Sequence, residues 1–252
     1  MSDSIYTTGE YWAKNAHYHL EDSAWKARQL AELISQGDGM VHGAGRRLAV
    51  AEIGCGAGGV LNAFVSILRD SGYPCQGTGY DISVQAIEKA RSLFPSCEFV
   101  VGDLTEMPVK YDLLLICDVL EHVPDPREML IRCLDRSSAV LIHLPLDDYL
   151  WGRMLRGWQG HFDYVRDAWG HIHYFTKRTG LALVDSAGGQ VVDWRYTKWG
   201  LEQDFDTSRS GRVARVLREC GFRINMDISA RLLGGVSIGM LCMKGSRVLR
   251  PA

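Results

Sequence analysis

One short stretch constrains the fold of this chain more than any other. An apolar run, 48–53, ends in a loop with almost no side chains, 54–59, and a second apolar run with helical spacing, 60–68, follows at once. This order predicts a strand, a tight turn and a helix. Glycines suit such a turn because the backbone takes positive φ and a ligand approaches where a β-carbon would clash. The N–H groups that open the helix favour polar or anionic ligand groups, so the stretch predicts a ligand-binding α/β sheet.

The same loop satisfies two ligand-binding patterns. Gly54, Gly56 and Gly59 fit G-x-G-x-x-G, which binds the pyrophosphate of a dinucleotide. The second pattern, E-x-G-x-G-x-G, begins at Glu52 and takes Gly58 as its third glycine. The loop by itself leaves both patterns open.

The order of strands and helices predicts where a ligand binds. Seven apolar segments have the character of strands: 48–53, 77–81, 97–101, 111–117, 139–144, 190–196 and 236–243. Helical segments alternate with them from 48 to 145, which predicts a parallel sheet with right-handed crossovers. Ligands of such sheets bind beyond the carboxyl ends of the strands. The residues expected at those ends are Glu52 to Gly58, Asp81, Asp103, Asp118 and His143 to Leu146.

Two regions stand outside this alternation. Residues 1–46 precede the first strand and predict an N-terminal helical lid, so that 47–252 forms the main domain. The aromatic segment 11–19 is expected to pack on the sheet, with closure over a cofactor as the alternative. Residues 146–175 hold eight aromatic residues directly after a strand end. They predict an insertion that lines a substrate pocket, packs its rings on itself, or does both.

Composition disfavours several classes of partner. The net charge is -2 with no long basic run, so a nucleic acid or an acidic membrane surface is not expected as a partner. No apolar stretch approaches the roughly 20 residues of a membrane span, and the first residues lack a secretory signal. Seven cysteines occur singly, which suits a reducing compartment. We therefore expect a cytoplasmic protein, and the sequence leaves its oligomeric state open.

Four motifs in order resemble those of class I S-adenosylmethionine-dependent methyltransferases. They are 52–58, Gly79 to Ser83, Gly102 to Leu104, and Tyr111 through Pro126. The resemblance covers 48–145 and implies a Rossmann-like, doubly wound, seven-stranded and mostly parallel sheet with S-adenosylmethionine as cofactor. A looser similarity, His171 to Thr176 before a helix, points to the bacterial small-molecule subgroup that includes ubiquinone-type O-methyltransferases.

The resemblance also implies contacts with the methionine and ribose portions of the cofactor. The glycine loop would lie against the methionine portion, with contributions from Glu52, Gly54, Cys55, Gly56 and Gly58. An alternative for Glu52 is that it only braces the loop. Asp81 would bind both ribose hydroxyls, because one carboxylate can accept from two hydroxyl donors. Ile82 would pack on the adenine.

The remaining implied contacts involve the adenine and the amino acid end. Asp103 would accept a hydrogen bond from the adenine amino group, with Leu104 beside the ring. The backbone around Cys117 and Asp118 would lie near the amino acid end of the cofactor.

Catalysis of methyl transfer needs little protein chemistry. The sulfonium is an excellent leaving group, so alignment for an in-line displacement can supply most of the rate. A base is required only if the acceptor must lose a proton, and the candidates are His173 first, His171 second, and then His143. The alternative for His173 and His171 is a hydrogen bond to backbone near the next helix. No metal site is predicted, because Asp147 and Asp148 lack a third ligand at suitable spacing.

These features predict a methyltransferase that acts on a small-molecule acceptor, with oxygen favoured as the acceptor atom. Methylation of nitrogen or carbon in a biosynthetic intermediate is an alternative. A second alternative is a nicotinamide-dependent oxidoreductase, since the loop also fits the dinucleotide pattern. A third is a methyltransferase-like protein that has become a non-catalytic partner.

Overall fold

A computed structural model describes residues 20–35, 46–202 and 209–245. The aromatic segment 11–19, for which the sequence suggested packing or cofactor closure, lies outside the described residues. Within the described residues, no helix combines the length and the apolar character that crossing a membrane requires.

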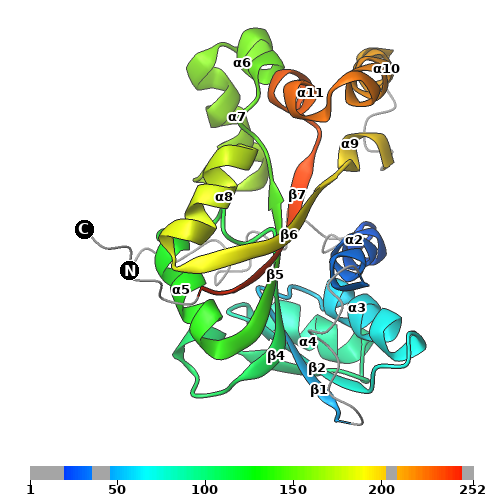
Figure 1. The fold of residues 1–252 in the computed structure, drawn as a ribbon, viewed down its shortest axis with the longest axis vertical. Helices are drawn as coiled ribbons and strands as arrows, with labels where there is room; N and C mark the ends of the chain where they lie inside the picture. Colours follow the sequence, from blue (N-terminus) through cyan, green and yellow to red (C-terminus); the bar gives the residue numbers. More distant parts are fainter. Residues whose placement is uncertain (1–19, 36–45, 203–208, 246–252) are drawn as a thin grey trace.

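Seven strands form one sheet, in the spatial order β3-β2-β1-β4-β5-β7-β6 (Figure 1). The strands are β1 Leu48–Ile53, β2 Cys75–Asp81, β3 Glu98–Val101, β4 Tyr111–Cys117, β5 Ser137–Pro145, β6 Gly189–Thr197 and β7 Ser237–Lys244. The first five pair in parallel, and β7 runs antiparallel to both β5 and β6. This confirms the predicted seven-stranded, mostly parallel sheet, and every expected strand is present with ends within two residues of the prediction.

Helices cover both faces of the sheet. They are α2 Ser23–Ser35, α3 Gly59–Asp70, α4 Val84–Leu93, α5 Pro126–Arg136, α6 Leu150–Arg156, α7 Trp158–Trp169, α8 Lys177–Ser186, α9 Trp199–Glu202, α10 Arg209–Ile224 and α11 Met226–Leu233, with a short 3-10 turn, η1, at Leu104–Glu106. Strand β4 shows the two layers: Leu113 and Leu115 pack with α2, α3 and α4, whereas Leu114 and Ile116 pack with α5 and α8. Alternate side chains of one apolar strand therefore enter two separate cores.

Helix α2 is an integral part of the first of these cores. Its residues Ala27, Leu30 and Leu33 are fully buried, and the helix packs along α3. The two helices approach so closely that a β-carbon on Gly59 would lie 2.5 Å from Oγ of Ser23. Gly59 is thus required by helix packing. The assignment of 1–46 as a separate lid stays a prediction.

Helices also gather at the carboxyl edge of β5. Ser237 at the start of β7 pairs with Pro145 at the end of β5 and with Thr197 at the end of β6. The connections that hold α6 to α8 and α9 to α11 therefore leave from this edge, and α11 packs against α6 (Figure 1). The aromatic stretch forms α6 and α7, and part of it packs on itself, with the Phe162 ring 4.3 Å from the Tyr174 ring.

Candidate cofactor and acceptor site

The backbone of the glycine loop distinguishes the two sequence patterns. Gly54, Gly56 and Gly58 have φ of 65°, 52° and 81°, whereas Gly59 does not have a positive φ and begins α3. A β-carbon on Gly58 would lie 2.5 Å from the Phe99 ring. Positive φ therefore falls on the glycines of E-x-G-x-G-x-G, whereas Gly59 is required by helix packing.

Asp81 ties the glycine loop to the end of β2. Its Oδ2 accepts a hydrogen bond from the backbone N of Gly56 at 2.9 Å, and its Oδ1 accepts one from Ser83 N at 2.8 Å. Burial raises the pKa of Asp81, and these backbone hydrogen bonds oppose that rise. Each carboxylate oxygen has a second lone pair that can accept from a ribose hydroxyl. The adjacent Ile82 is 47% exposed, so it offers apolar surface for an adenine.

Glu52 lies beneath the loop as a buried brace. Glu52 is only 2% exposed, and its Oε2 accepts a hydrogen bond from Leu61 N in the first turn of α3 at 3.0 Å. Desolvation raises the pKa of Glu52 to about 8. Cys55 is also buried. Direct cofactor contacts of both residues stay predictions.

We expect the Glu52→Gln variant to lose part of the pH dependence of stability. Because the pKa of Glu52 is raised in the fold, the unfolded chain releases this proton at a lower pH than the folded chain does. The free energy of unfolding therefore falls as pH rises from about 4.3 towards about 8. The amide does not ionise, so the variant should gain roughly 3–4 kcal/mol on the wild type between about pH 5 and pH 8. Urea unfolding at both pH values measures the gain. The exposed Glu128→Gln is the control, and parallel pH profiles of Glu52→Gln and wild type would contradict the expectation.

Asp103 and Leu104 occupy different environments. Asp103 caps η1, with Oδ1 accepting from Thr105 N at 2.8 Å, and it is partly exposed at the end of β3. Leu104 is fully buried in the core with α5, so its side chain is not exposed for the contact with the adenine ring that the resemblance implied. The physical reason is that η1 turns this apolar side chain inward. Among the predicted adenine contacts, Ile82 is the exposed apolar side chain.

Asp118 is the centre of a charged network at the end of β4. Its Oδ2 accepts from Lys26 Nζ at 2.8 Å, and its Oδ1 lies 2.6 Å from His143 Nδ1. His143 Nε2 lies 2.9 Å from Oγ1 of Thr197. Burial by itself raises the pKa of Asp118, but Lys26 and His143 outweigh it and hold that pKa well below its ordinary value. No sequence pattern pointed to Lys26, which lies in α2, far along the chain from Asp118.

This network corrects the prediction of His143 as a candidate base. The residue is only 2% exposed, and both of its ring nitrogens are hydrogen-bonded within the protein. A base needs a nitrogen within reach of the acceptor proton. His143 therefore has a structural role, joining β5 to Asp118 and to β6. Cys117, next to Asp118, is buried as well.

His171 and His173 lie in a loop that is tied to the segment after β4. The carbonyl of Glu121 accepts hydrogen bonds from the backbone N of Ile172 at 2.8 Å and of His173 at 3.1 Å. His173 Nε2 donates to the carbonyl of Val123 at 3.0 Å, so it bonds to backbone as in the alternative, but in the segment after β4 and not near the start of the next helix. His171 Nδ1 lies 2.6 Å from Oδ2 of Asp147. A carboxylate that orients an imidazole is the arrangement of a general base, so the geometry favours His171 over His173.

Two groups of side chains in the described parts of the chain are close enough to hold an ion. They are Cys117, Asp118 and His143, and Glu121, His122 and His171. In the first group the ammonium of Lys26 already neutralises Asp118. The prediction of no metal site considered spacing along the chain, and the second group combines residues about 50 positions apart that only the fold brings together.

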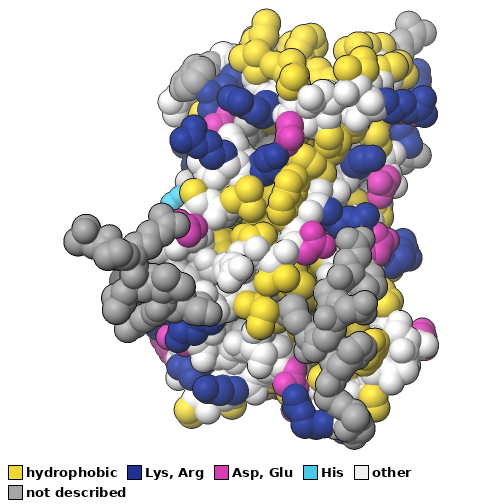
Figure 2. Space-filling model, viewed as in Figure 1, with side chains coloured by type: hydrophobic (Ala, Val, Ile, Leu, Met, Phe, Trp, Pro, Cys, Tyr) yellow, Lys and Arg dark blue, Asp and Glu magenta, His cyan; other side chains and the backbone are white. Residues whose placement is uncertain are grey.

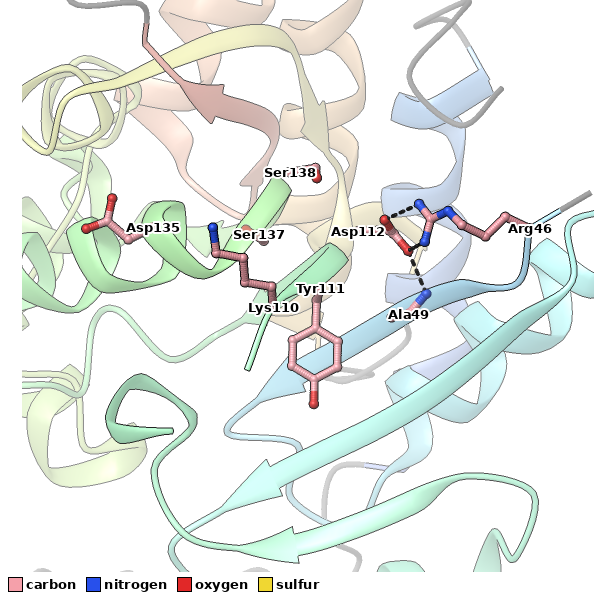
Figure 3. Close-up of a pocket in the computed structure, with 8 residues that line it drawn as sticks. All are labelled: Arg46, Ala49, Lys110, Tyr111, Asp112, Asp135, Ser137 and Ser138. Atoms are coloured by element: carbon pink, nitrogen blue, oxygen red, sulfur yellow. Dashed lines mark hydrogen bonds and ion pairs between the residues drawn. The ribbon is translucent and has the colours of Figure 1, made fainter. Parts of the chain in front are cut away.

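A hollow of about 320 Å³ lies at the opposite edge of the sheet (Figure 3). Its lining comes from the amino ends of β1, β4 and β5, away from the glycine loop. There Asp112 accepts hydrogen bonds from Ala49 N at 2.8 Å and from the Arg46 guanidinium. These bonds fasten β4 to β1, so the role of Asp112 is structural.

The fold and the loop geometry together define a Rossmann-like domain of the kind that binds S-adenosylmethionine. A family model described as "Methyltransferase domain" matches residues 14–193. The chain belongs to this family, and its motifs place it in the class I S-adenosylmethionine-dependent group. The predicted class and cofactor are thereby confirmed, and the nicotinamide alternative is not supported.

Similar proteins span a range of acceptors. Trans-aconitate 2-methyltransferase of Escherichia coli is 28% identical over 158 residues, and this match covers 59% of each chain. The chain thus spans less than two thirds of that relative. Magnesium protoporphyrin IX methyltransferase of Synechocystis, solved with bound S-adenosylhomocysteine, shares the fold at a TM-score of 0.56, with 13% identity and coverage of 96% and 97%. A plantazolicin methyltransferase structure gives a TM-score of 0.58, with 17% identity and 95% coverage of each chain.

Proposed function

We propose that the chain transfers the methyl group of S-adenosylmethionine to an oxygen atom of a small-molecule acceptor, by in-line displacement. The main support is the carboxyl edge of the sheet, where Asp81 holds the positive-φ glycine loop and two helical connections rise beside it. Nitrogen and carbon acceptors are the alternatives, and analysis of the methylated product separates them. The cytoplasmic location stays a prediction.

The helices beside this edge offer a surface suited to an apolar part of the acceptor. Figure 2 shows hydrophobic side chains gathered at the end of the molecule where Figure 1 draws α6, α10 and α11. In these helices Met154 is 67% exposed, Val216 59% and Ile228 56%. Clustered apolar exposure of this kind marks binding surfaces. The predicted substrate-lining role of 146–175 is therefore extended to α10 and α11.

The pair of His171 and Asp147 supports oxygen as the acceptor atom. A hydroxyl is a poor nucleophile until its proton is removed, and an imidazole held by a carboxylate can remove it near neutral pH. The pair lies between the end of β5 and the start of α8, on the same edge as the glycine loop. The names of the relatives include trans-aconitate and magnesium protoporphyrin IX, so membership of the family does not specify the acceptor.

Two measurements test the proposed function. S-adenosylhomocysteine should raise the thermal unfolding temperature more than NAD does. Methyl-labelled S-adenosylmethionine, incubated with the protein and a small-molecule extract, should yield a labelled product that the Asp81→Ala variant does not form. Stabilisation by NAD alone would indicate an oxidoreductase. Binding of S-adenosylhomocysteine with no transfer to any extract would favour the non-catalytic alternative.

A further inference from the structure

Three side chains with metal-ligand chemistry converge after β4. The donor atoms of Glu121, His122 and His171 all lie within 4.8 Å of one another. Nε2 of His122 and Nε2 of His171 are each 4.0 Å from the same oxygen, Oε1 of Glu121. Because the Glu121 carbonyl also accepts from the backbone N of Ile172 and His173, the two segments are held together independently of these side chains.

The hydrogen bonds of the two imidazoles determine which ring nitrogen carries the lone pair, and that nitrogen is the one nearer to Glu121. Nδ1 of His122 donates to the carbonyl of Gly170 at 3.1 Å, and Nδ1 of His171 donates to Asp147 at 2.6 Å. In each neutral ring the lone pair is therefore on Nε2, the atom nearer to Glu121. Histidines that bind metals have this arrangement, with the outer N–H held by a carbonyl or carboxylate.

Glu121 provides an independent observation. The residue is completely buried, and neither carboxylate oxygen has a hydrogen-bond partner among the described residues. A buried carboxylate without partners is strongly unfavourable, and almost all buried polar groups in folded proteins have partners. A cation among Glu121 and the two imidazoles would satisfy this carboxylate.

We propose that Glu121, His122 and His171 bind a divalent transition-metal ion. An ion about 2.1 Å from two tetrahedral ligands holds them about 3.4 Å apart, so each 4.0 Å pair needs to close by roughly 0.6 Å. Two imidazoles and one carboxylate form a donor set that suits Zn²⁺ or Fe²⁺ and leaves coordination positions open. The carboxylates of Glu121 and Asp147 together balance the charge of the ion.

The open position gives the site a role that rests on the proposed function. The ligand Glu121 follows Asp118 by three residues, so the ion would lie at the edge of the sheet where the acceptor is expected. An oxygen donor of the acceptor could bind there, and the ion would then lower the pKa of a coordinated hydroxyl in place of proton removal by His171, whose Nε2 lone pair would be held as a ligand. The acceptors expected are therefore molecules with a hydroxyl or a carboxylate group able to coordinate a metal.

The test titrates the full-length, tag-free, chelator-treated chain with Zn²⁺ by calorimetry and with Co²⁺ by visible absorption. We expect one ion per chain in the wild type and at least about 100-fold weaker binding in Glu121→Gln and in His171→Asn. The outer partner variant, Asp147→Asn, should weaken binding by about 10- to 100-fold. The matched control is His173→Asn, a histidine of the same loop that is bonded to backbone, and it should bind as the wild type does.

Binding of S-adenosylhomocysteine identifies the variants that fold, and it is measured separately from ion binding. A Glu121→Gln protein that binds S-adenosylhomocysteine but not Zn²⁺ supports the proposal. If that variant does not fold, His171→Asn decides, because the side chain is 12% exposed and its loss leaves a smaller defect. A wild type that binds no ion overturns the proposal. The proposal is also overturned if His143→Gln loses ion binding while a folded His171→Asn binds the ion normally. Ion binding is measured without turnover, so a failure of proposed methyl transfer leaves this result intact, and the reverse also holds.

Discussion

Replacing Asp81 by alanine should weaken the binding of S-adenosylhomocysteine by at least about 100-fold. The proposed contacts are two hydrogen bonds from ribose hydroxyls to a carboxylate, each of which contributes about 1.5–3 kcal/mol. A loss of about 3 kcal/mol corresponds to slightly more than 100-fold in the dissociation constant. The variant also removes the hydrogen bond from Gly56 N, which loosens the glycine loop and acts in the same direction. Calorimetric titration of wild type and variant measures the change.

Two further variants separate the loss of the ribose contacts from general damage to the fold. Asp125→Ala removes an aspartate that also caps backbone, accepting from Glu128 N at 2.9 Å, but at the start of α5 and with no bond to the glycine loop among the described residues. It should bind S-adenosylhomocysteine as the wild type does. Asp81→Asn keeps a carbonyl oxygen and should show an intermediate loss. Unchanged binding by Asp81→Ala would contradict the assignment of the ribose site.

The second large effect is expected for Asp118→Asn, which should lower the free energy of unfolding by about 2–3 kcal/mol. The substitution removes one of the two carboxylates that pair with the Lys26 ammonium, the other being Asp22, and removing one member of a buried ion pair costs about 3–5 kcal/mol. The side chains of Lys26 and Asp118 remain 13% and 27% exposed, so we expect a value near the lower end of that range. Asparagine tolerates the positive φ of 54° at this position, so backbone strain does not confound the result.

Urea unfolding at neutral pH measures this loss. Asp135→Asn is the matched control, because Asp135 pairs with Lys244 at the surface, where both side chains are more than half exposed, and its removal should cost less than about 1 kcal/mol. The pKa of Asp118 is lowered in the fold, so its contribution is present above the ordinary aspartate pKa of about 3.9 and is lost as pH falls below it. Equal stabilities of Asp118→Asn and Asp135→Asn would contradict a stabilising network.

Predictions that depended on neighbouring residues were accurate. The seven strands were found because apolar runs and turn residues are local features, and the parallel arrangement followed from their alternation with helices. Gly58 could be preferred to Gly59 from its motif, and its φ of 81° is a property of the turn itself.

Predictions that depended on burial or on distant partners were less accurate. His143 was a candidate base because it ends a strand, but Asp118 and Thr197 occupy both of its nitrogens. Leu104 was expected at the adenine, but it is turned into the core. The position of α11 beside α6 follows from the antiparallel pairing of β7, which spacing along the chain does not specify.

The sequence by itself therefore predicted the class of fold and the edge of the sheet expected to bind a ligand, because these depend on periodicity and on turn geometry within short segments. The methyl donor was predicted from the resemblance of four ordered motifs to those of class I methyltransferases. Only the tertiary structure brought Lys26 to Asp118 and placed Glu121 and His122 beside His171. Those contacts join residues from separate elements. Their chemistry depends on burial and on which side of each imidazole is hydrogen-bonded, and neither is specified by spacing along the chain.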